Sequence, residues 1–192
     1  MKRLLIAAAA LLAGCVSVSE GVGSFSEVGG DAVLVVGKIE IIPPIRAEEQ
    51  RVNPGADLFN VKRHYIGRAI LFTSDTPAYR ERTDHAMNPP LEQTFFLKVP
   101  RAQPYIVKGS VTMDMAQRQG RMDQTELLFP VPLKLDLRAE DKAVYVGTLR
   151  LHRDEFHEVT KVELRDDYAS AIVDYRKQFG AAPAPRKALL RR

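Results

Sequence analysis

The chain has 192 residues, of which 45% are hydrophobic and 27% charged, so it is long enough to bury the core of one ordinary domain. The formal net charge is +4, but residues 1–14 hold two basic side chains and residues 186–192 hold four, so residues 15–185 carry −2. A nucleic-acid surface needs a basic patch on the folded body, and this distribution argues against that class. The single cysteine excludes an intrachain disulfide.

The first fifteen residues have the layout of a secretory signal. Two basic residues precede the apolar run 4–13, and Gly14 and Cys15 follow it. A run of about ten residues is too short to cross a bilayer, which takes roughly 20. The sequence LAGC at 12–15 resembles the lipobox of bacterial lipoproteins. That resemblance implies cleavage between Gly14 and Cys15, followed by acylation of Cys15.

Lipidation also explains why the cysteine has no partner. A structural cysteine in an oxidising compartment normally forms a disulfide, and a second cysteine does not exist here. Each buried methylene of an acyl chain contributes about 0.8 kcal/mol, and two or three chains on Cys15 would anchor a domain stably. In bacteria with two membranes an aspartate after the cysteine resembles a retention signal for the inner membrane, so Val16 favours the outer membrane. Beyond this covalent lipid, we expect no cofactor.

The composition divides the chain into four parts. We expect a signal peptide at 1–14, a lipidated and flexible Ser/Gly-rich tether at 15–31, a folded domain at 32–180 and a disordered basic tail at 181–192. The basic tail offers charges that anionic phospholipid attracts, although a solubilising tail is the simpler interpretation.

Hydrophobic alternation predicts strands separated by turn residues. We expect strands at 32–42, 63–73, 94–100, 105–113, 127–137, 144–151 and 158–164, with 94–100 and 105–113 forming a hairpin. A helix should follow Asp166 and end before Gly180, because Tyr168, Tyr175 and Phe179 lie on one helical stripe with Ile172. The sequence thus predicts a mainly β fold, an antiparallel β-sandwich with one C-terminal α-helix.

A family resemblance supports this fold. The sequence FFLKVP at 95–100, followed by Tyr105, Ile106 and Val107, is similar to a hairpin of transthyretin-like (prealbumin-like) sandwich domains. The sequence YVGTL at 145–149, with DDY at 166–168, is similar to uncharacterised bacterial lipoproteins that carry such a domain. The resemblance implies an immunoglobulin-like sandwich and implies no reaction.

Two groups of side chains are candidate metal ligands. The segment 152–158 contains His152, Asp154, His157 and Glu158, but the two histidines are five apart, whereas a helical zinc site needs four. A charged, solvated turn explains the same residues. Met113 and Met115 share a face on a strand, where thioethers suit Cu(I), although methionine is more often a core residue.

The sequence shows no identifiable nucleophile. It contains no Gly-x-Ser-x-Gly elbow, its cysteine is assigned to lipid, and the Thr-Asp-His sequence at 83–85 stands alone in the expected loop 74–93. We therefore expect a non-catalytic binding or assembly module on the periplasmic or surface side of the outer membrane. Its loops 45–62 and 74–93 would face an envelope protein partner. A metal-binding lipoprotein is the alternative, and an envelope hydrolase is the third.

Overall fold

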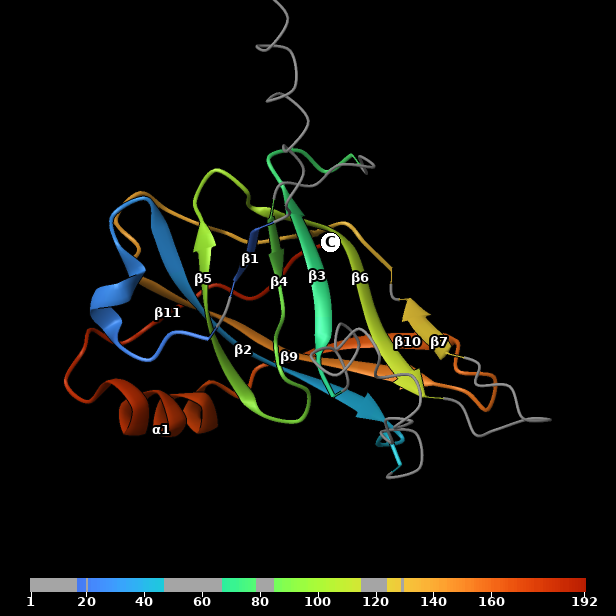
Figure 1. Ribbon diagram of the computed structural model, residues 1–192. Coiled ribbons are helices and arrows are strands. Elements are labelled where there is room, and N and C mark those ends of the chain that lie inside the picture. The colour runs from blue at the N-terminus through green and yellow to red at the C-terminus, as the bar shows by residue number, and fades with distance from the viewer. Residues whose placement is uncertain (1–16, 20, 47–66, 79–84, 115–123, 129) are drawn as a thin grey trace, which may run out of the picture.

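The computed structural model describes residues 17–19, 21–46, 67–78, 85–114, 124–128 and 130–192. Strands make up most of its secondary structure, and the α-helix α1 lies near the C-terminal end (Figure 1). The elements in chain order are β1 (Ser17–Ser19), the 3₁₀ helix η1 (Phe25–Val28), β2 (Ala32–Ile42), β3 (Ala69–Ser74), β4 (His85–Met87), β5 (Thr94–Pro100), β6 (Tyr105–Asp114), β7 (Gln124–Leu128), β8 (Leu133–Lys134), β9 (Ala143–Arg153), β10 (Val159–Arg165), α1 (Tyr168–Phe179) and β11 (Arg186–Lys187).

The strands form two packed sheets. Sheet A has the order β1-β4-β3-β6-β7, with β8 also pairing with β6, and sheet B has the order β10-β9-β2-β5, with β11 also pairing with β9. Most pairs are antiparallel, whereas β1–β4, β2–β9 and β9–β11 are parallel. The fold is therefore mainly β and consistent with a β-sandwich, with α1 as the α-helix of the described residues, as the sequence predicts.

Strand β2 contributes to two hydrophobic cores. Val33, Val35 and Ile39 face the core between the sheets, while Leu34 and Val36 face α1 on the outer side of sheet B. This explains why the first half of the strand is apolar on both faces, as expected for an interior strand. The bounds of β2 agree with the prediction, and Pro43 follows it because proline cannot donate to the ladder.

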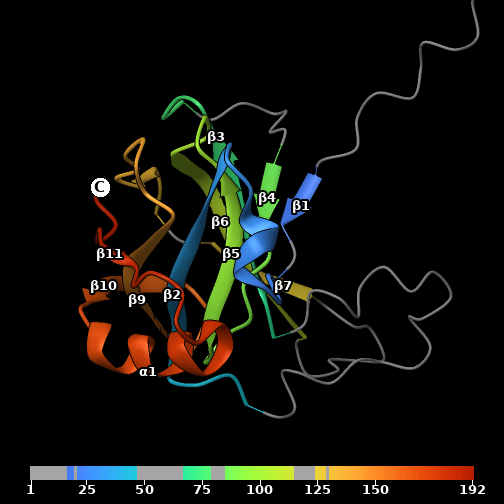
Figure 2. The same cartoon turned by 90° about the vertical axis from the view of Figure 1, so that its left-hand side faces the viewer.

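Helix α1 covers part of the outer face of sheet B (Figure 2). Tyr175 is buried, and Phe179 packs edge-on against Phe96 of β5 with ring centroids 5.2 Å apart. The helix begins after Asp167 and ends at Gly180, whose φ of 59° suits a residue without a β-carbon. The predicted helix and its aromatic stripe are thus confirmed.

Gly147 marks the point where β9 changes its neighbour. Val144 and Tyr145 pair with β11, and Thr148 onward pairs with β10 along the same edge. Gly147 has φ of 99°, and an added Cβ would lie 2.7 Å from Leu164 Cδ1. Only glycine fits this conformation and this space, so both strands can share one edge of β9.

The predicted hairpin between β5 and β6 is wrong. β5 pairs with β2 in sheet B and β6 pairs with β3 in sheet A, so residues 101–104 cross from one sheet to the other. Alternation shows which side chains face a core but does not show which strand lies alongside. The two strands on which the transthyretin-like resemblance rests, β5 and β6, therefore do not pair with each other.

Two segments expected to be flexible are ordered where the structure describes them. Within 15–31, β1 and η1 form and Val22 and Val28 are buried against the α1 side of sheet B. Within 181–192, β11 pairs with β9 and Ala188 is buried between the sheets. Composition predicted a flexible tether at 15–31 and a disordered tail at 181–192 because the apolar residues of these segments do not form a periodic pattern.

Other strand boundaries differ from the expectation. The expected strand 127–137 divides into β7 and β8, because Pro130 and Pro132 interrupt the ladder. The expected loop 74–93 contains β4, which lies between β1 and β3. Most of the expected loop 45–62, and residues 79–84 of the second loop, lie outside the described residues.

Candidate functional site

A polar cleft of about 340 Å³ lies between α1 and the outer face of sheet B. Its walls carry positive and negative side chains together with hydroxyl groups. The lining residues are Gly37, Lys38, Glu40, Thr94, Tyr145, Thr148, Arg150, Arg165, Asp167, Ser170 and Ala171. The volume falls at the lower end of the range for ligand pockets, so the cleft can take a small polar molecule or a few residues of a peptide.

The floor of the cleft belongs to a row of charged side chains across β2, β9 and β10. Register places Arg150 directly between Glu40 and Glu163. Arg150 Nε lies 3.0 Å from Glu40 Oε2, and Arg150 Nη1 lies 3.8 Å from Glu163 Oε2. Lys38 Nζ reaches Glu40 Oε1 at 2.7 Å. We call these four residues, with His152 and Lys161, the charge row.

The charge row keeps both glutamates ionised. The hydrogen bond from Lys38, with the charges of Lys38 and Arg150, lowers the pKa of Glu40. The hydrogen bond from His152, with the nearby cations Lys161 and Arg150, lowers the pKa of Glu163. An opposite charge at hydrogen-bonding distance favours the carboxylate form, so Glu40 and Glu163 both stay ionised at neutral pH.

Hydrogen bonds hold the helical wall of the cleft against the sheet. The backbone N–H of Asp167 donates to the Tyr145 hydroxyl at 2.7 Å, and Thr94 Oγ1 donates to Asp174 Oδ2 at 2.6 Å. Burial raises the pKa of Tyr145, so its phenol stays protonated. These contacts fix α1 at both the first turn and the middle of the helix, and the cleft is preformed.

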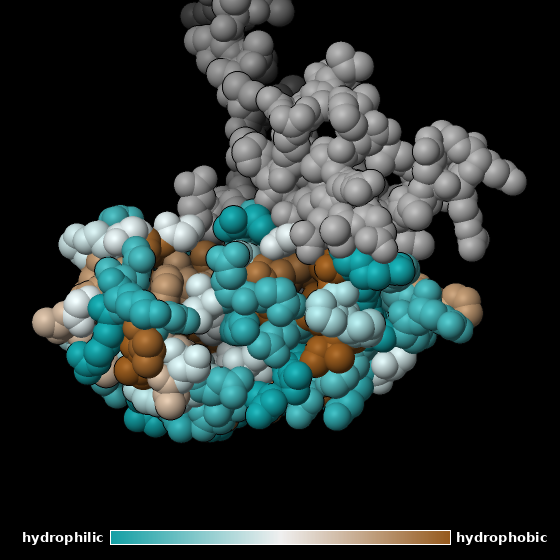
Figure 3. Space-filling view, turned by 90° about the horizontal axis from the view of Figure 1, so that it is seen from below, coloured by the Kyte–Doolittle hydropathy of each residue, from teal (hydrophilic) through white to brown (hydrophobic). Residues whose placement is uncertain are grey.

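The chemistry available in the cleft is ion pairing and hydrogen bonding. Its lining contains neither histidine nor cysteine, and Tyr145 is neutral and already bonded. Arg165 is exposed at the edge of the cleft and adds a cation that a ligand can reach. The surface seen from below Figure 1 is likewise largely hydrophilic, with apolar side chains in separate small patches (Figure 3).

The structure does not bring the predicted histidine ligands together. His152 Nε2 lies 3.2 Å from Glu163 Oε2, whereas His157 Nδ1 lies 2.8 Å from Arg153 Nη1. Asp154 Oδ1 accepts the backbone N–H groups of Phe156 and Glu158, both at 2.9 Å. In the part of the chain that the structure describes, three or more His, Cys, Asp or Glu residues do not gather as a metal site. The turn is organised by its own hydrogen bonds.

The remaining residues that the sequence suggested as site residues lie in different parts of the chain. Met113 lies in β6, where its backbone pairs with Thr125, and Met115, Gly14 and Cys15 lie outside the described residues. His85, expected in a loop, is buried in β4. Burial lowers the pKa of its imidazole, although a hydrogen bond to the backbone of Lys98 opposes that effect. The imidazole therefore stays neutral between the two sheets.

Sequence reasoning missed the cleft, although a signal for it exists. Charged side chains recur at every second position in three strands: Lys38 and Glu40, Arg150 and His152, then Lys161, Glu163 and Arg165. That alternation is typical of a solvent-facing sheet surface. The alternation does not show how the three strands align, because the β2–β9 pair joins residues as far apart as Leu34 and Ala143.

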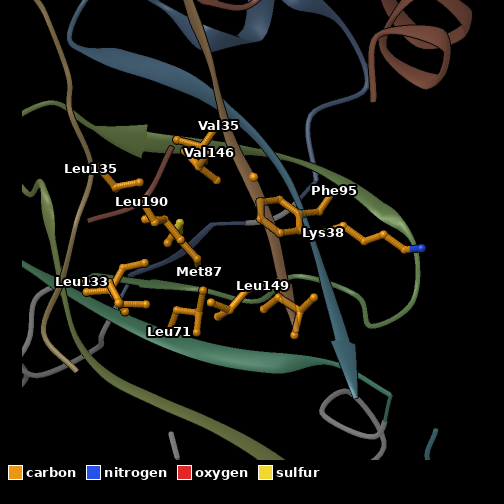
Figure 4. Close-up of a pocket in the computed structure, with 13 residues that line it drawn as sticks. Val35, Lys38, Leu71, Met87, Phe95, Leu133, Leu135, Val146, Leu149 and Leu190 are labelled. Carbon is orange, nitrogen blue, oxygen red and sulfur yellow. The ribbon is translucent and has the colours of Figure 1, made fainter. Parts of the chain in front are cut away.

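A second cavity lies between the sheets and is not a ligand site (Figure 4). Its volume is about 20 Å³ and its walls are apolar, with Leu71, Met87, Leu133 and Leu190 from four segments. Space for about one water molecule, without polar partners, stays dry. Figure 4 shows the Lys38 ammonium group directed away from it. That group donates a hydrogen bond to Glu40 instead.

Comparisons with protein-family models, with curated proteins and with solved structures found no match. Among the described helices, none combines the length and the apolar character needed to span a bilayer. The cleft and the lipobox-like sequence are therefore the features of the chain that bear on its function.

Proposed function

We propose that this chain is a lipoprotein held in the outer membrane by acyl chains on Cys15, and that its β-sandwich is a non-catalytic module that binds an envelope partner. The cleft between α1 and sheet B carries this proposal, since it is open, polar and preformed. The lipobox-like sequence at 12–15 supports the anchor.

Binding fits the cleft better than catalysis does because its charged groups neutralise one another. Glu40 is shared between Lys38 and Arg150, and Arg150 also approaches Glu163. A general base needs a free proton-accepting group near pH 7, whereas the carboxyl groups of Glu40 and Glu163 are ion-paired and have lowered pKa values. Ion-paired rows of this kind instead give orientation and specificity to a polar partner.

The lining indicates what kind of partner fits. Lys38, Arg150 and Arg165 exceed Glu40 and Asp167 by one charge, so a ligand with both charges and a slight acidic excess is complementary. Ser170 and Thr148 add hydroxyl groups that can donate or accept hydrogen bonds. A polar, acidic peptide segment of an envelope protein meets these requirements.

Photo-crosslinking from the cleft tests the binding proposal. A photoreactive amino acid at Ser170, in the full lipidated chain in native membranes, should capture one near-stoichiometric partner. The same amino acid at Arg176, exposed on another part of α1, is the matched control and should not. Adding Arg165→Glu should reduce capture from position 170 at least several-fold. Equal capture from positions 170 and 176 would contradict the proposal. Capture from position 170 that Arg165→Glu does not reduce would contradict it as well.

The anchor has its own test. The Cys15→Ser variant should leave the membrane fraction, because the described helices offer no other means of insertion. The intact mass of the purified wild-type protein should exceed that of residues 15–192 by two or three acyl chains. A Cys15→Ser protein that remains in detergent-extracted membranes would disprove the anchor without affecting the cleft.

A further inference from the structure

We infer that the sandwich stands end-on on its membrane, with the end that carries the start of β1 against anionic phospholipid headgroups. This end also contains residues 101–104 and 138–142 and is here called the anchor end. The inference rests on the proposed acylation of Cys15 and adds to it an orientation and a lipid-binding surface.

Chain length places the anchor beside the domain. Ser17, the first residue of β1, comes two residues after Cys15. Two residues span at most about 7 Å, whatever their conformation. Acyl chains on Cys15 would therefore bring Ser17 close to the headgroups.

β1 is fixed to the sandwich and so transmits this constraint. It pairs in parallel with β4 over three residues, from Ser17 with His85 to Ser19 with Met87. Just beyond it, the backbone N–H of Val22 donates to Phe96 O at 3.0 Å, and the Val22 side chain is buried. A lipid at this position therefore holds one end of the sandwich down instead of tethering a freely rotating body.

The register shows what else lies at the anchor end. Residues paired across sheet A form one row from Ser17 through His85, Thr73 and Ile106 to Leu133. Four strand spacings of about 4.8 Å make this row about 19 Å long. In Figure 1, β1 and the C-terminus both lie toward the upper part of the molecule, away from α1.

Basic side chains lie at the far side of that row. Lys134 is exposed next to Leu133, and its backbone exchanges two hydrogen bonds with Arg191, at 2.7 and 3.1 Å. Arg191 and Arg192 are exposed, and Arg191 Nη2 lies 4.0 Å from Asp136 Oδ2. We call Lys134, Arg191 and Arg192 the basic tip. An anionic surface attracts basic side chains that lie close to it.

The turn at the opposite end carries several acidic side chains. The turn between β9 and β10 contains Asp154, Glu155 and Glu158, and β9 runs away from the anchor end. An anionic surface repels these carboxylates. The charge distribution and the position of Ser17 thus favour the same orientation. It leaves the cleft beside α1 accessible from the aqueous side, because α1 lies away from β1 (Figure 2).

Depth measurement on the lipidated chain tests the orientation. Acylated Cys15 leaves no free thiol, so Ala102→Cys at the anchor end and Glu155→Cys at the other end each give one labelling site. In vesicles of equal parts phosphatidylcholine and phosphatidylglycerol, a headgroup-attached quencher should quench a fluorophore at 102 several-fold more than at 155. Equal quenching, or stronger quenching at 155, would overturn the inference.

A pair of charge variants tests the headgroup contact. Arg191→Glu with Arg192→Glu should weaken quenching at 102 on these vesicles and leave it unchanged on pure phosphatidylcholine. Arg176→Glu with Lys177→Glu on α1 makes the same change in net charge and should have no effect. Equal effects of the two pairs would overturn the lipid contact. Intact mass on the same preparation separates failure of the anchor, seen as missing acyl chains, from failure of the orientation, seen with the acyl chains present.

Discussion

Asp141, in the loop before β9, accepts two hydrogen bonds from the Arg186 guanidinium of β11. Arg186 Nε and Nη2 donate to Asp141 Oδ1 and Oδ2, both at 2.7 Å, and the backbone N–H of Arg138 donates to Oδ2 at 2.7 Å. The Asp141 carboxylate is buried. The hydrogen bonds from Arg186, followed by that from Arg138, hold its pKa below the ordinary 3.8. The pair thus joins the C-terminal segment to the body of the domain.

Removing this carboxylate should destabilise the fold in a pH-dependent way. Asp141→Ala removes the buried carboxylate that accepts two hydrogen bonds from Arg186 and should lower the free energy of unfolding by about 3 kcal/mol at neutral pH. Because the folded pKa is lowered, the stabilisation is complete above 3.8 and is lost as the pH falls below 3.8. Denaturant unfolding gives the free energy of unfolding of wild type and of Asp141→Asn. The difference between these two free energies should be constant above this pH and should decrease below it.

Lys187→Ala provides the control for this prediction. Lys187 is the next residue along β11, and its ion pair with Asp166 at 2.7 Å is exposed. Exposed pairs contribute little because water screens them. Two results would contradict the role given to Asp141. One is a Lys187→Ala variant as unstable as Asp141→Ala, and the other is a difference in unfolding free energy between wild type and Asp141→Asn that does not depend on pH.

At the scale of elements, the C-terminal segment closes one side of the sandwich. The backbone N–H groups of Ala188 and Leu190 donate to Tyr145 and Val146 of sheet B, at 2.9 and 3.0 Å. Arg191 bonds with Lys134 of sheet A. The hydroxyls of Tyr168 and Tyr175 on α1 donate to Pro185 O and Pro183 O. One short segment therefore connects both sheets and the helix.

Deletion of residues 186–192 should consequently destabilise the domain strongly. The deletion removes Ala188 and Leu190 from the inter-sheet core and leaves Asp141 without Arg186. The loss should exceed about 3 kcal/mol in denaturant unfolding. If the deleted chain does not fold, Leu190→Ala should still show a loss of about 2 kcal/mol. Deletion of residue 192 alone is the control. If neither the deletion of residues 186–192 nor Leu190→Ala changed the stability, the segment would be disordered, as composition alone suggests.

The elements that the sequence predicts well are those with a strong period. The strands around Val35, Leu97 and Val146 and the helix around Tyr175 were predicted within a few residues, because alternation and helical spacing follow directly from burial. The C-terminal segment was missed because its order comes from partners such as Asp141, far away in sequence. Local patterns carry no information about such partners.

At the scale of the whole molecule, the two hydrophobic cores share their central strands. β2 places Val35 between the sheets and Val36 under α1, and β9 does the same with Val146 and Tyr145. Neither core can be lost while the other keeps its packing. Both cores should therefore unfold in one cooperative transition.

Adjacent residues of β5 offer matched probes for this prediction. Phe95 faces the inter-sheet core and Phe96 faces α1, and the chain has no tryptophan. In Phe95→Trp and in Phe96→Trp, unfolding followed by tryptophan fluorescence should coincide with unfolding followed by far-UV circular dichroism. A fluorescence change that precedes the loss of β structure in Phe96→Trp would show that the helical layer separates first.

The same shared strands explain why the site was harder to predict than the fold. The charged alternation of Glu40, Arg150 and Glu163 is visible in each strand, but the cleft exists only because β2 and β9 run side by side. The metal hypothesis relied on residues close in sequence, and the turn instead pairs His157 with Arg153 and His152 with Glu163. Proximity along the chain was a poor guide to proximity in space.

The parallel pairing of β2 with β9 also has a kinetic consequence. Leu34 pairs with Ala143, so a long loop must close before the central strands of sheet B meet, and folding dominated by such contacts is slow. Until then the sequence AVLVV at 32–36 remains unpaired and apolar on both faces, which invites pairing with the same segment of another chain. Refolding is therefore a competition between closure within one chain and aggregation between chains, and its yield should fall as protein concentration rises.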